Sequence, residues 1–255
     1  MEEIERLRAE IERIDEEILR LLEKRAEIAV KMGEIKRKLG IEVYDPLREK
    51  EVLTRVLKVK RRTLKDKDVE NVFREIISVC RRVQGDFLVA YLGPPGSFTH
   101  EAVLTIFGSS CLTLPCSTIS DVFKKVEEGE VSYGVVPIEN STGGFVAETL
   151  DSFVESNVKV YGETVVKVKL NLIVPPETKS LSEVKRVYSH PNALFQCKEF
   201  LIKNLPNIEL IPVSSTSKAV ELARKKGDAA IGSKTAAKYY GMTILASGVE
   251  GPRRN

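Results

Sequence analysis

Residues 4–36 read IERLRAEIERIDEEILRLLEKRAEIAVKMGEIK, and this stretch decides the fold of the N-terminal third. Its apolar residues recur at alternating spacings of three and four, which places them along one seam of a helix. These residues are Ile4, Leu7, Ile11, Ile14, Ile18, Leu21, Ile28, Met32 and Ile35. The stretch contains no proline and no glycine before Gly33. It therefore predicts one helix of about 35 residues, roughly 50 Å long.

One position of this seam is charged, because Arg25 stands where the pattern predicts an apolar residue. A guanidinium there is costly unless an anion pairs with it, either a glutamate of a neighbouring helix or a bound ligand. Lys36 lies about 20° around the helix from Arg25 and roughly 17 Å along it, so both cations face one groove. Arg8 lies about 42 Å from Lys36. One small acidic molecule can meet all three only if an antiparallel second chain supplies its Arg8, which predicts a dimer with two equivalent sites.

Two shorter helices are expected in the remainder of the first 85 residues. Gly40 ends the first helix, and Asp45-Pro46 supplies an N-cap and a first-turn proline for a second helix to about Arg62. A third helix should begin near Asp66 and end before Gly85. Its apolar face comprises Val69, Val72, Phe73, Ile76, Ile77, Cys80 and Val83. We therefore expect an all-helical domain over residues 1–85.

From Phe87 onward, short β-branched runs alternate with helical patterns, which is typical of an α/β domain. The expected strands are residues 87–92, 134–138, 165–174, 186–188, 209–213 and 229–231. Pro175-Pro176 is expected to separate two lobes with a cleft between them. The fold class is thus α plus α/β, with a two-lobed second domain over residues 86–255.

Composition argues against several classes of protein. The chain has 40 Lys and Arg against 37 Asp and Glu, interleaved in the first third, whereas a nucleic-acid binder shows an uncompensated basic stripe. No apolar run approaches the roughly 18 residues of a membrane span, and the acidic first residues do not resemble a secretory signal. The four cysteines form no CxxC pair, so we expect neither disulfides nor a metal site, and a cytoplasmic location.

The cationic positions belong to a set of short motifs in the helical region. These are Leu7-Arg8, Ile14-Asp15, Leu21-Leu22-Glu23-Lys24-Arg25, Gly33-Glu34-Ile35-Lys36, Asp45-Pro46-Leu47-Arg48-Glu49 and Gln84. Together, over residues 4–84, they resemble the all-helical chorismate mutase family. The resemblance implies three helices per chain in an intertwined dimer. Cys80 departs from the family pattern, because some members place a serine there.

This resemblance also implies roles for the polar residues. Arg8 of one chain and Arg25 of the other would bind the two carboxylates of chorismate. Lys36 and Gln84 would bind the ether oxygen, Asp45 or Glu49 the ring hydroxyl, and Arg48 would support the site. The rearrangement of chorismate to prephenate is intramolecular and needs no nucleophile, so we expect catalysis by positioning and fixed charge, with no metal and no organic cofactor.

Three polar loops stand out in the α/β region. The sequence GPPGSFT at residues 93–99 is a turn that could bind an anion at a helix start, although a simple tight turn explains it equally well. The sequence PIENSTGG at residues 137–144 places an acid, an amide and two hydroxyls after a strand, as a surface turn could. The third loop is YSHP at residues 188–191, followed by Gln196.

In this order, and followed by STS at residues 215–217, the loops resemble prephenate dehydratase over about residues 88–250. The resemblance implies two lobes similar to periplasmic binding proteins, with prephenate bound between them by Asn140, Ser189 and Gln196. It implies further substrate contacts from Ser97, Thr99, Glu139, Ser141 and His190. The implied reaction removes carbon dioxide and water from prephenate to give phenylpyruvate, a step of phenylalanine biosynthesis.

The family pattern continues into a Thr-Arg-Phe motif and a phenylalanine-binding ACT domain, whereas this sequence stops at Pro252-Arg253-Arg254-Asn255. We therefore expect mutase activity, a weak or absent dehydratase activity and no inhibition by phenylalanine. The alternative is a non-enzymatic dimeric sensor, a coiled coil joined to a two-lobed small-molecule-binding domain. Arg25 and Lys36 argue against it, because a dimerisation seam gains nothing from cations there.

Overall fold

The computed structural model describes residues 1–85, 87–141 and 143–251. Three sequence features lie outside the described residues: Asp86 at the expected domain boundary, Thr142 of the second polar loop, and the terminal Pro252-Arg253-Arg254-Asn255. The chain forms two compact units. The helical unit comprises Met1–Leu88 and Phe107–Leu112, and the α/β unit comprises Val89–Ile106 and Thr113–Asn255.

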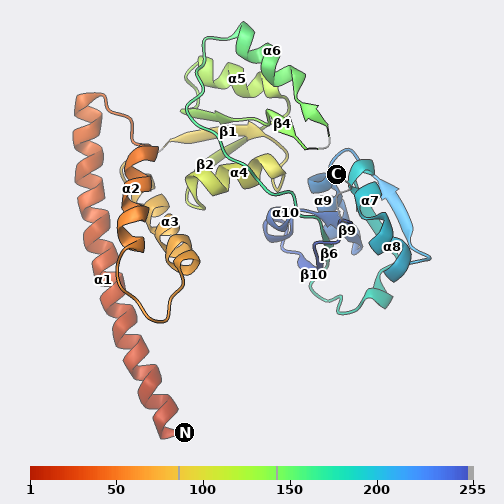
Figure 1. Cartoon of the computed structure of the whole chain (residues 1–255), viewed down its shortest axis with the longest axis horizontal. Coiled ribbons are helices and arrows are strands. Elements are labelled where there is room, and N and C mark those ends of the chain that lie inside the picture. The colour runs from red at the N-terminus through yellow and green to blue at the C-terminus, as the bar shows by residue number, and fades with distance from the viewer. Residues whose placement is uncertain (86, 142, 252–255) are drawn as a thin grey trace. The chain divides into compact units, whose positions relative to one another are not determined.

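The helical unit contains α1 (Glu2–Leu39), α2 (Pro46–Leu57) and α3 (Asp66–Arg82), with α3 packed against both other helices (Figure 1). The prediction of one long first helix is confirmed, since α1 has 38 residues and ends at Gly40 in the left-handed conformation. The N-terminal part of α1 extends beyond the loop that joins α2 to α3 (Figure 1).

The second helix is shorter than predicted, because α2 ends at Leu57 and not near Arg62. The side chain of Arg61 explains this ending. Its Nη1 donates to the carbonyl oxygens of Leu57 at 2.8 Å and Val59 at 3.1 Å. A cation that binds the last carbonyls of a helix satisfies acceptors that the next turn would otherwise use.

The apolar seam of α1 is open to solvent along its length. All nine seam residues from Ile4 to Ile35 are between 47% and 62% exposed. On this helix the buried residues are Ala29 and Gly33, which belong to another face. Within this chain, α3 therefore leaves the heptad seam uncovered.

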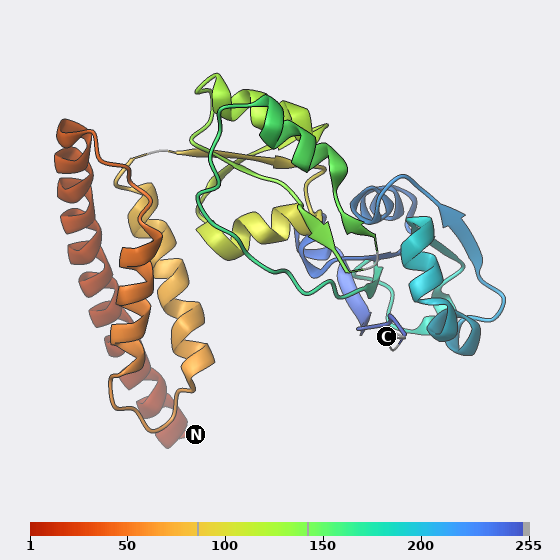
Figure 2. The same cartoon turned by 45° about the horizontal axis from the view of Figure 1, so that its top comes forward.

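The first sheet of the α/β unit has the strand order β2-β1-β3. Its strands are β1 (Leu88–Leu92), β2 (Leu112–Cys116) and β3 (Tyr133–Val135). Helix α4 (Phe98–Phe107) covers one face, and α5 (Ile119–Glu127) with α6 (Ala147–Glu155) covers the other (Figure 2). The short hairpin of β4 (Glu139–Asn140) and β5 (Gly144–Phe145) precedes α6.

The second sheet has five strands in the order β10-β6-β9-β7-β8. They are β6 (Asn171–Val174), β7 (Arg186–Ser189), β8 (Glu209–Pro212), β9 (Ala229–Gly232) and β10 (Thr243–Ser247). β7 runs parallel to β8 and β9, whereas β6 runs antiparallel to β9 and β10. The helical segments are η1 (Leu181–Glu183), α7 (Pro191–Gln196), α8 (Lys198–Asn204), α9 (Thr216–Lys226) and α10 (Lys234–Tyr239).

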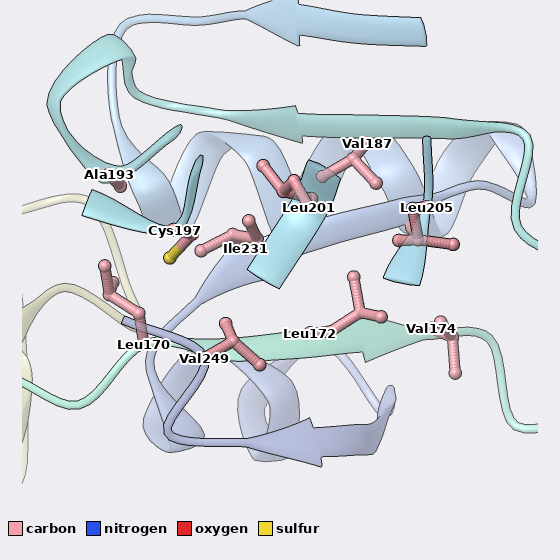
Figure 3. Packing of buried hydrophobic residues seen from close by; sticks show 11 residues of the cluster. Leu170, Leu172, Val174, Val187, Ala193, Cys197, Leu201, Leu205, Ile231 and Val249 are labelled. Atoms are coloured by element: carbon pink, nitrogen blue, oxygen red, sulfur yellow. The ribbon is translucent and has the colours of Figure 1, made fainter. Parts of the chain in front are cut away.

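Both faces of the second sheet are buried. Leu172, Val187 and Ile231 pack on the side of α7 and α8, as Figure 3 shows, together with Leu201 of α8 and Cys197, which lies between the two helices. The alternate residues of the same strands, Ile173, Tyr188 and Ala230, pack with α9 and α10. This two-fold alternation explains why these strands read as continuous apolar runs in the sequence.

The predicted lobe boundary at Pro175-Pro176 is wrong. The strand immediately before these prolines, β6, pairs with β9 and β10 and therefore belongs to the second sheet. The connection between the two sheets is instead the segment of residues 156–170, and the strand expected from residue 165 begins only at Asn171. The prolines terminate β6, because proline cannot donate to a sheet ladder.

Candidate active sites

Three polar residues of the helical unit gather where α1 ends and α2 begins. Lys36, in the last turn of α1, donates from Nζ to the carbonyl oxygen of Val43 at 2.9 Å. Asp45 caps α2 by accepting the Arg48 N–H at 2.9 Å. Burial raises the pKa of the Glu49 carboxyl and Asp45 raises it further, whereas Lys36 lowers it. Lys36, Asp45 and Glu49 therefore lie within electrostatic reach of one another.

Gln84 joins this group through a close approach of two helices. A Cβ atom on Gly33 would lie 2.0 Å from the Gln84 carbonyl oxygen, so only glycine allows α1 and the end of α3 to touch here. Gly33 and Lys36 are three residues apart and share a helix face. The Gln84 side chain donates from Nε2 to the Cys80 carbonyl oxygen at 3.2 Å. The structure thus places Gln84 beside the turn of α1 that carries Lys36.

The three predicted site arginines lie apart from this group or on its rim. Arg8 pairs with Glu5 at 2.8 Å and Arg48 pairs with Glu51 at 2.8 Å, all on exposed surface. Arg25 is half-buried on α1, and no ion pair joins it to another residue in the described ranges. An internal glutamate partner for Arg25, one of the two alternatives, therefore finds no support in the described part of this chain.

Sequence reasoning missed Arg81, which is 3% exposed and pairs with Glu49. A signal was present, because Arg81 follows Ile77 by four residues and so falls on the apolar face of α3. Arg81 is thus a cation at an apolar position of α3, as Arg25 is a cation at an apolar position of the α1 seam.

The first polar loop of the α/β unit is held by hydrogen bonds to its own helix. The Ser97 hydroxyl donates to the Leu92 carbonyl oxygen and accepts the His100 N–H, both at 3.1 Å. His100 Nδ1 accepts the Gly96 N–H at 3.0 Å, and its ring stacks on Tyr91 with centroids 4.8 Å apart. Burial lowers the pKa of His100, which favours the neutral ring that can accept this bond.

The same loop is also bound to the helices behind the second sheet. Ser217 donates to the Pro95 carbonyl oxygen, and Ser233 donates to the Gly96 carbonyl oxygen at 2.7 Å. Gly96 has φ +83°, and a Cβ there would lie 2.7 Å from Ala236 Cα, so glycine is required twice over. Ser233 and Ala236 were not anticipated, because the sequence gives no sign that residues 137 positions apart bond to each other.

The other predicted dehydratase residues bond within their own parts of the fold. Asn140 Oδ1 accepts the Gly143 N–H at 2.9 Å inside the β4–β5 hairpin. Ser189 is fully buried and donates to the Ile231 carbonyl oxygen at 2.8 Å, and His190 Nδ1 accepts the Asn192 N–H at the start of α7. The remaining predicted residues are exposed or half-buried: Thr99, Glu139, Ser141 and Gln196. Their substrate contacts stay predictions.

The described residues contain neither a metal-binding cluster nor a membrane-spanning helix. No group of three His, Cys, Asp or Glu side chains there could hold a metal ion. No helix in the same ranges is long and apolar enough to cross a membrane.

Comparison with known proteins assigns both units to families. Residues 7–85 match chorismate mutase type II, and residues 89–255 match prephenate dehydratase. The bifunctional chorismate mutase/prephenate dehydratase of Aquifex aeolicus is 45% identical over 255 residues, covering 98% of this chain and 70% of that protein. Two further bifunctional relatives are 40% and 38% identical, and this chain spans 59% and 57% of their lengths.

Solved structures resemble the α/β unit. Prephenate dehydratase from Arthrobacter aurescens, solved in complex with L-Phe, is 30% identical to this chain with a TM-score of 0.57. The match covers 64% of this chain and 55% of the Arthrobacter chain. GqqA, described as a novel type of quorum quenching acylase, is 26% identical with a TM-score of 0.58, over 64% of this chain and 59% of its own. With its chorismate mutase type II domain followed by a prephenate dehydratase domain, the chain belongs to the bifunctional chorismate mutase/prephenate dehydratase family.

Proposed function

We propose that this chain catalyses two successive reactions of phenylalanine biosynthesis. The helical unit rearranges chorismate to prephenate, and the α/β unit removes carbon dioxide and water from prephenate to give phenylpyruvate. The observation that carries the first activity is the group of Lys36, Asp45, Glu49 and Gln84 within the span that matches chorismate mutase type II.

The mutase mechanism follows from the groups in this site. Lys36 uses one of its three donors on Val43, so two remain for the ether oxygen of chorismate, where negative charge develops as the bond breaks. The Gln84 amide is the second donor to that oxygen. Because Asp45 and Glu49 both offer carboxylate oxygens, either accepts a hydrogen bond from the ring hydroxyl. None of these groups forms a covalent bond, and their effect is to hold the reactive conformer and stabilise its charge.

Binding of the two substrate carboxylates requires a second copy of the chain. Arg25 lies on the same helix as Lys36, but Arg8 is about 42 Å from Lys36 along one continuous α1. The exposed apolar seam of α1 supports pairing of two α1 helices, because exposed apolar stretches of this length mark interaction surfaces. In an antiparallel dimer, Arg8 of one chain reaches the Arg25 and Lys36 of the other, and Arg48 supports the site from its rim. Two equivalent sites result.

The dehydratase reaction uses the polar loops of the α/β unit. We assign Asn140, Ser189 and Gln196 to prephenate, with Ser97 and Thr99 at the start of α4, where backbone N–H groups suit a carboxylate. Glu139, Ser141 and His190 complete the proposed contacts. Loss of carbon dioxide sends its electron pair into the ring, and the ring then expels its hydroxyl, which leaves as water after taking up a proton.

The test is to supply chorismate to the purified protein and follow its ultraviolet absorbance, with prephenate supplied separately and phenylpyruvate measured. Turnover of chorismate supports the mutase, and phenylpyruvate formation supports the dehydratase. Saturable binding of either compound without turnover contradicts the corresponding activity and favours a small-molecule sensor.

A further inference from the structure

Arg81 occupies an unusual place for a charged side chain. It is 3% exposed, and its guanidinium lies 5.0 Å from the ring centroid of Tyr44, 5.5 Å from that of Phe87 and 5.7 Å from that of Phe107. All four residues belong to the helical unit. Aromatic faces attract a desolvated cation, so the cage stabilises the charge without neutralising it.

Among the described residues, the anion that pairs with this charge is Glu49. Arg81 Nε lies 2.9 Å from Glu49 Oε1 as an ion-pair contact, and Nη2 donates a hydrogen bond to Oε2 at 3.3 Å, so the guanidinium contacts both carboxylate oxygens. Arg81 Nε and Nη1 are both buried, and neither makes a hydrogen bond within the described ranges. A residue needed only for packing would pack here more favourably if it were apolar, because burying an incompletely paired guanidinium is costly.

Glu49 in turn connects Arg81 with the proposed mutase site. The charged groups that act on its carboxylate are Arg81 and Arg74 of α3, Asp45 at the start of α2 and Lys36 of α1. Burial and Asp45 both favour the protonated acid, and Arg81 is the largest influence in the opposite direction. A protonated Glu49 would still carry oxygens, but it would lose the charge that makes it a strong acceptor.

We propose that Arg81 is a positioning residue of the mutase reaction, which holds the Glu49 carboxylate by both oxygens in the orientation and the ionised form that accept the ring hydroxyl. Arg81 does not touch the substrate itself. This inference rests on the proposed mutase function and on Glu49 being the acceptor of that hydroxyl.

The test compares pH profiles of kcat/KM for chorismate in wild type, Arg81→Gln, Arg81→Lys, Glu49→Gln and a matched control, Arg74→Gln. Arg74 lies on the same helix, pairs with half-buried Glu70 and is the smallest of the influences on Glu49. Without Arg81 the pKa of Glu49 rises. The acid limb of the profile, where kcat/KM falls as the pH is lowered, should therefore move up by about one pH unit in Arg81→Gln. Arg74→Gln should keep the wild-type limb, and Glu49→Gln should abolish it.

The conservative variant separates charge from orientation. Arg81→Lys keeps the charge, so its acid limb should stay near that of wild type. Its kcat should still fall several-fold, because one ammonium cannot hold two oxygens in a fixed plane. Circular dichroism and size-exclusion chromatography check folding, and Arg81→Lys alone decides the matter if Arg81→Gln does not fold. A folded Arg81→Gln with an unshifted limb, or Arg81→Lys with wild-type kcat, overturns the inference.

Two results separate this inference from the function on which it rests. If wild type does not consume chorismate, the proposed function fails and this inference fails with it. If wild type is active, the inference also requires that the effects of the two substitutions are coupled. Arg81→Gln should then change kcat/KM by less than about twofold in a Glu49→Gln background. Independent, additive effects of the two substitutions contradict it.

Discussion

At the scale of single residues, the proposed mutase site consists of fixed charges and amides that are positioned before substrate arrives. Lys36 is held by Val43, Asp45 by its role as the cap of α2, and Glu49 by Arg81. Groups that are already oriented stabilise a charge-separated transition state without the cost of reorganising as it forms. Single substitutions of these groups should therefore lower kcat strongly.

Lys36→Ala provides the first prediction at this scale. Removing the ammonium takes away the main donor to the ether oxygen, so kcat for chorismate should fall at least about a hundredfold. Lys31→Ala is the matched control, an exposed lysine of the same helix, and it should keep wild-type kcat. Chorismate absorbance gives the rates, and size-exclusion chromatography should show the same oligomer for both variants. Retention of wild-type kcat in Lys36→Ala would exclude its assigned role.

His100 provides a prediction for pH and stability. Burial lowers its pKa when the protein is folded, so the folded state favours the neutral ring, which accepts the Gly96 N–H. This contribution to stability is present above the ordinary histidine pKa of about 6.5 and is lost as the pH falls through the lower folded value. Between pH 7.5 and pH 5, Tm should fall further in wild type than in His100→Asn. Equal falls in Tm for wild type and His100→Asn, measured by scanning calorimetry, would contradict this prediction.

Some of these site residues can be recognised from the sequence and others cannot, and the reason is physical. Arg25 and Lys36 are visible because a long heptad pattern fixes their faces, and any cation on an apolar seam stands out. Ser233 is not visible, because its bond to Gly96 depends on tertiary packing that no local pattern encodes. Arg81 lies between these cases, since it falls on the apolar face of α3 but its partner Glu49 lies on another helix.

At the scale of elements, the sequence predicts helices α1 and α3 well, and it predicts the strands and their sheets less well. The long period of α1 and the apolar face of α3 fix those helices, and both have the expected extents. The strand β2 was missed because Pro115 interrupts its apolar run, and the structure tolerates this proline because β2 is an edge strand. The boundary at Pro175-Pro176 was misplaced because sequence does not reveal which sheet a strand joins.

Gly33→Ala tests the contact between α1 and α3. Its new Cβ would lie 2.0 Å from the Gln84 carbonyl oxygen, so the helices must separate and Gln84 must leave its place beside Lys36. We expect a loss of about 1–3 kcal/mol in stability and a clear fall in mutase kcat. Gly85→Ala is the control, because the nearest atom to its Cβ would be 3.6 Å away. Urea unfolding and chorismate turnover measure the two effects, and a Gly33→Ala protein as active and stable as the Gly85→Ala control would show that the contact does not matter.

At the scale of the whole molecule, the proposed mutase site needs two copies of the helical unit. The α1 seam is at least 47% exposed at every apolar position from Ile4 to Ile35, and Arg25 has no anionic partner in the described part of its own chain. A single antiparallel partner would cover the seam and bring its Arg8 to the site. Under the proposed dimer, neither chain has a complete mutase site alone, and kinetics can test this proposal.

The most direct test combines two inactive chains in one dimer. Arg8→Ala and Lys36→Ala each damage both sites of their own homodimer, so each should be inactive alone. A purified heterodimer of the two carries both substitutions in one site and leaves the other intact. It should therefore recover about half of the wild-type mutase rate per dimer. A heterodimer as inactive as its two parents would contradict a site shared between chains.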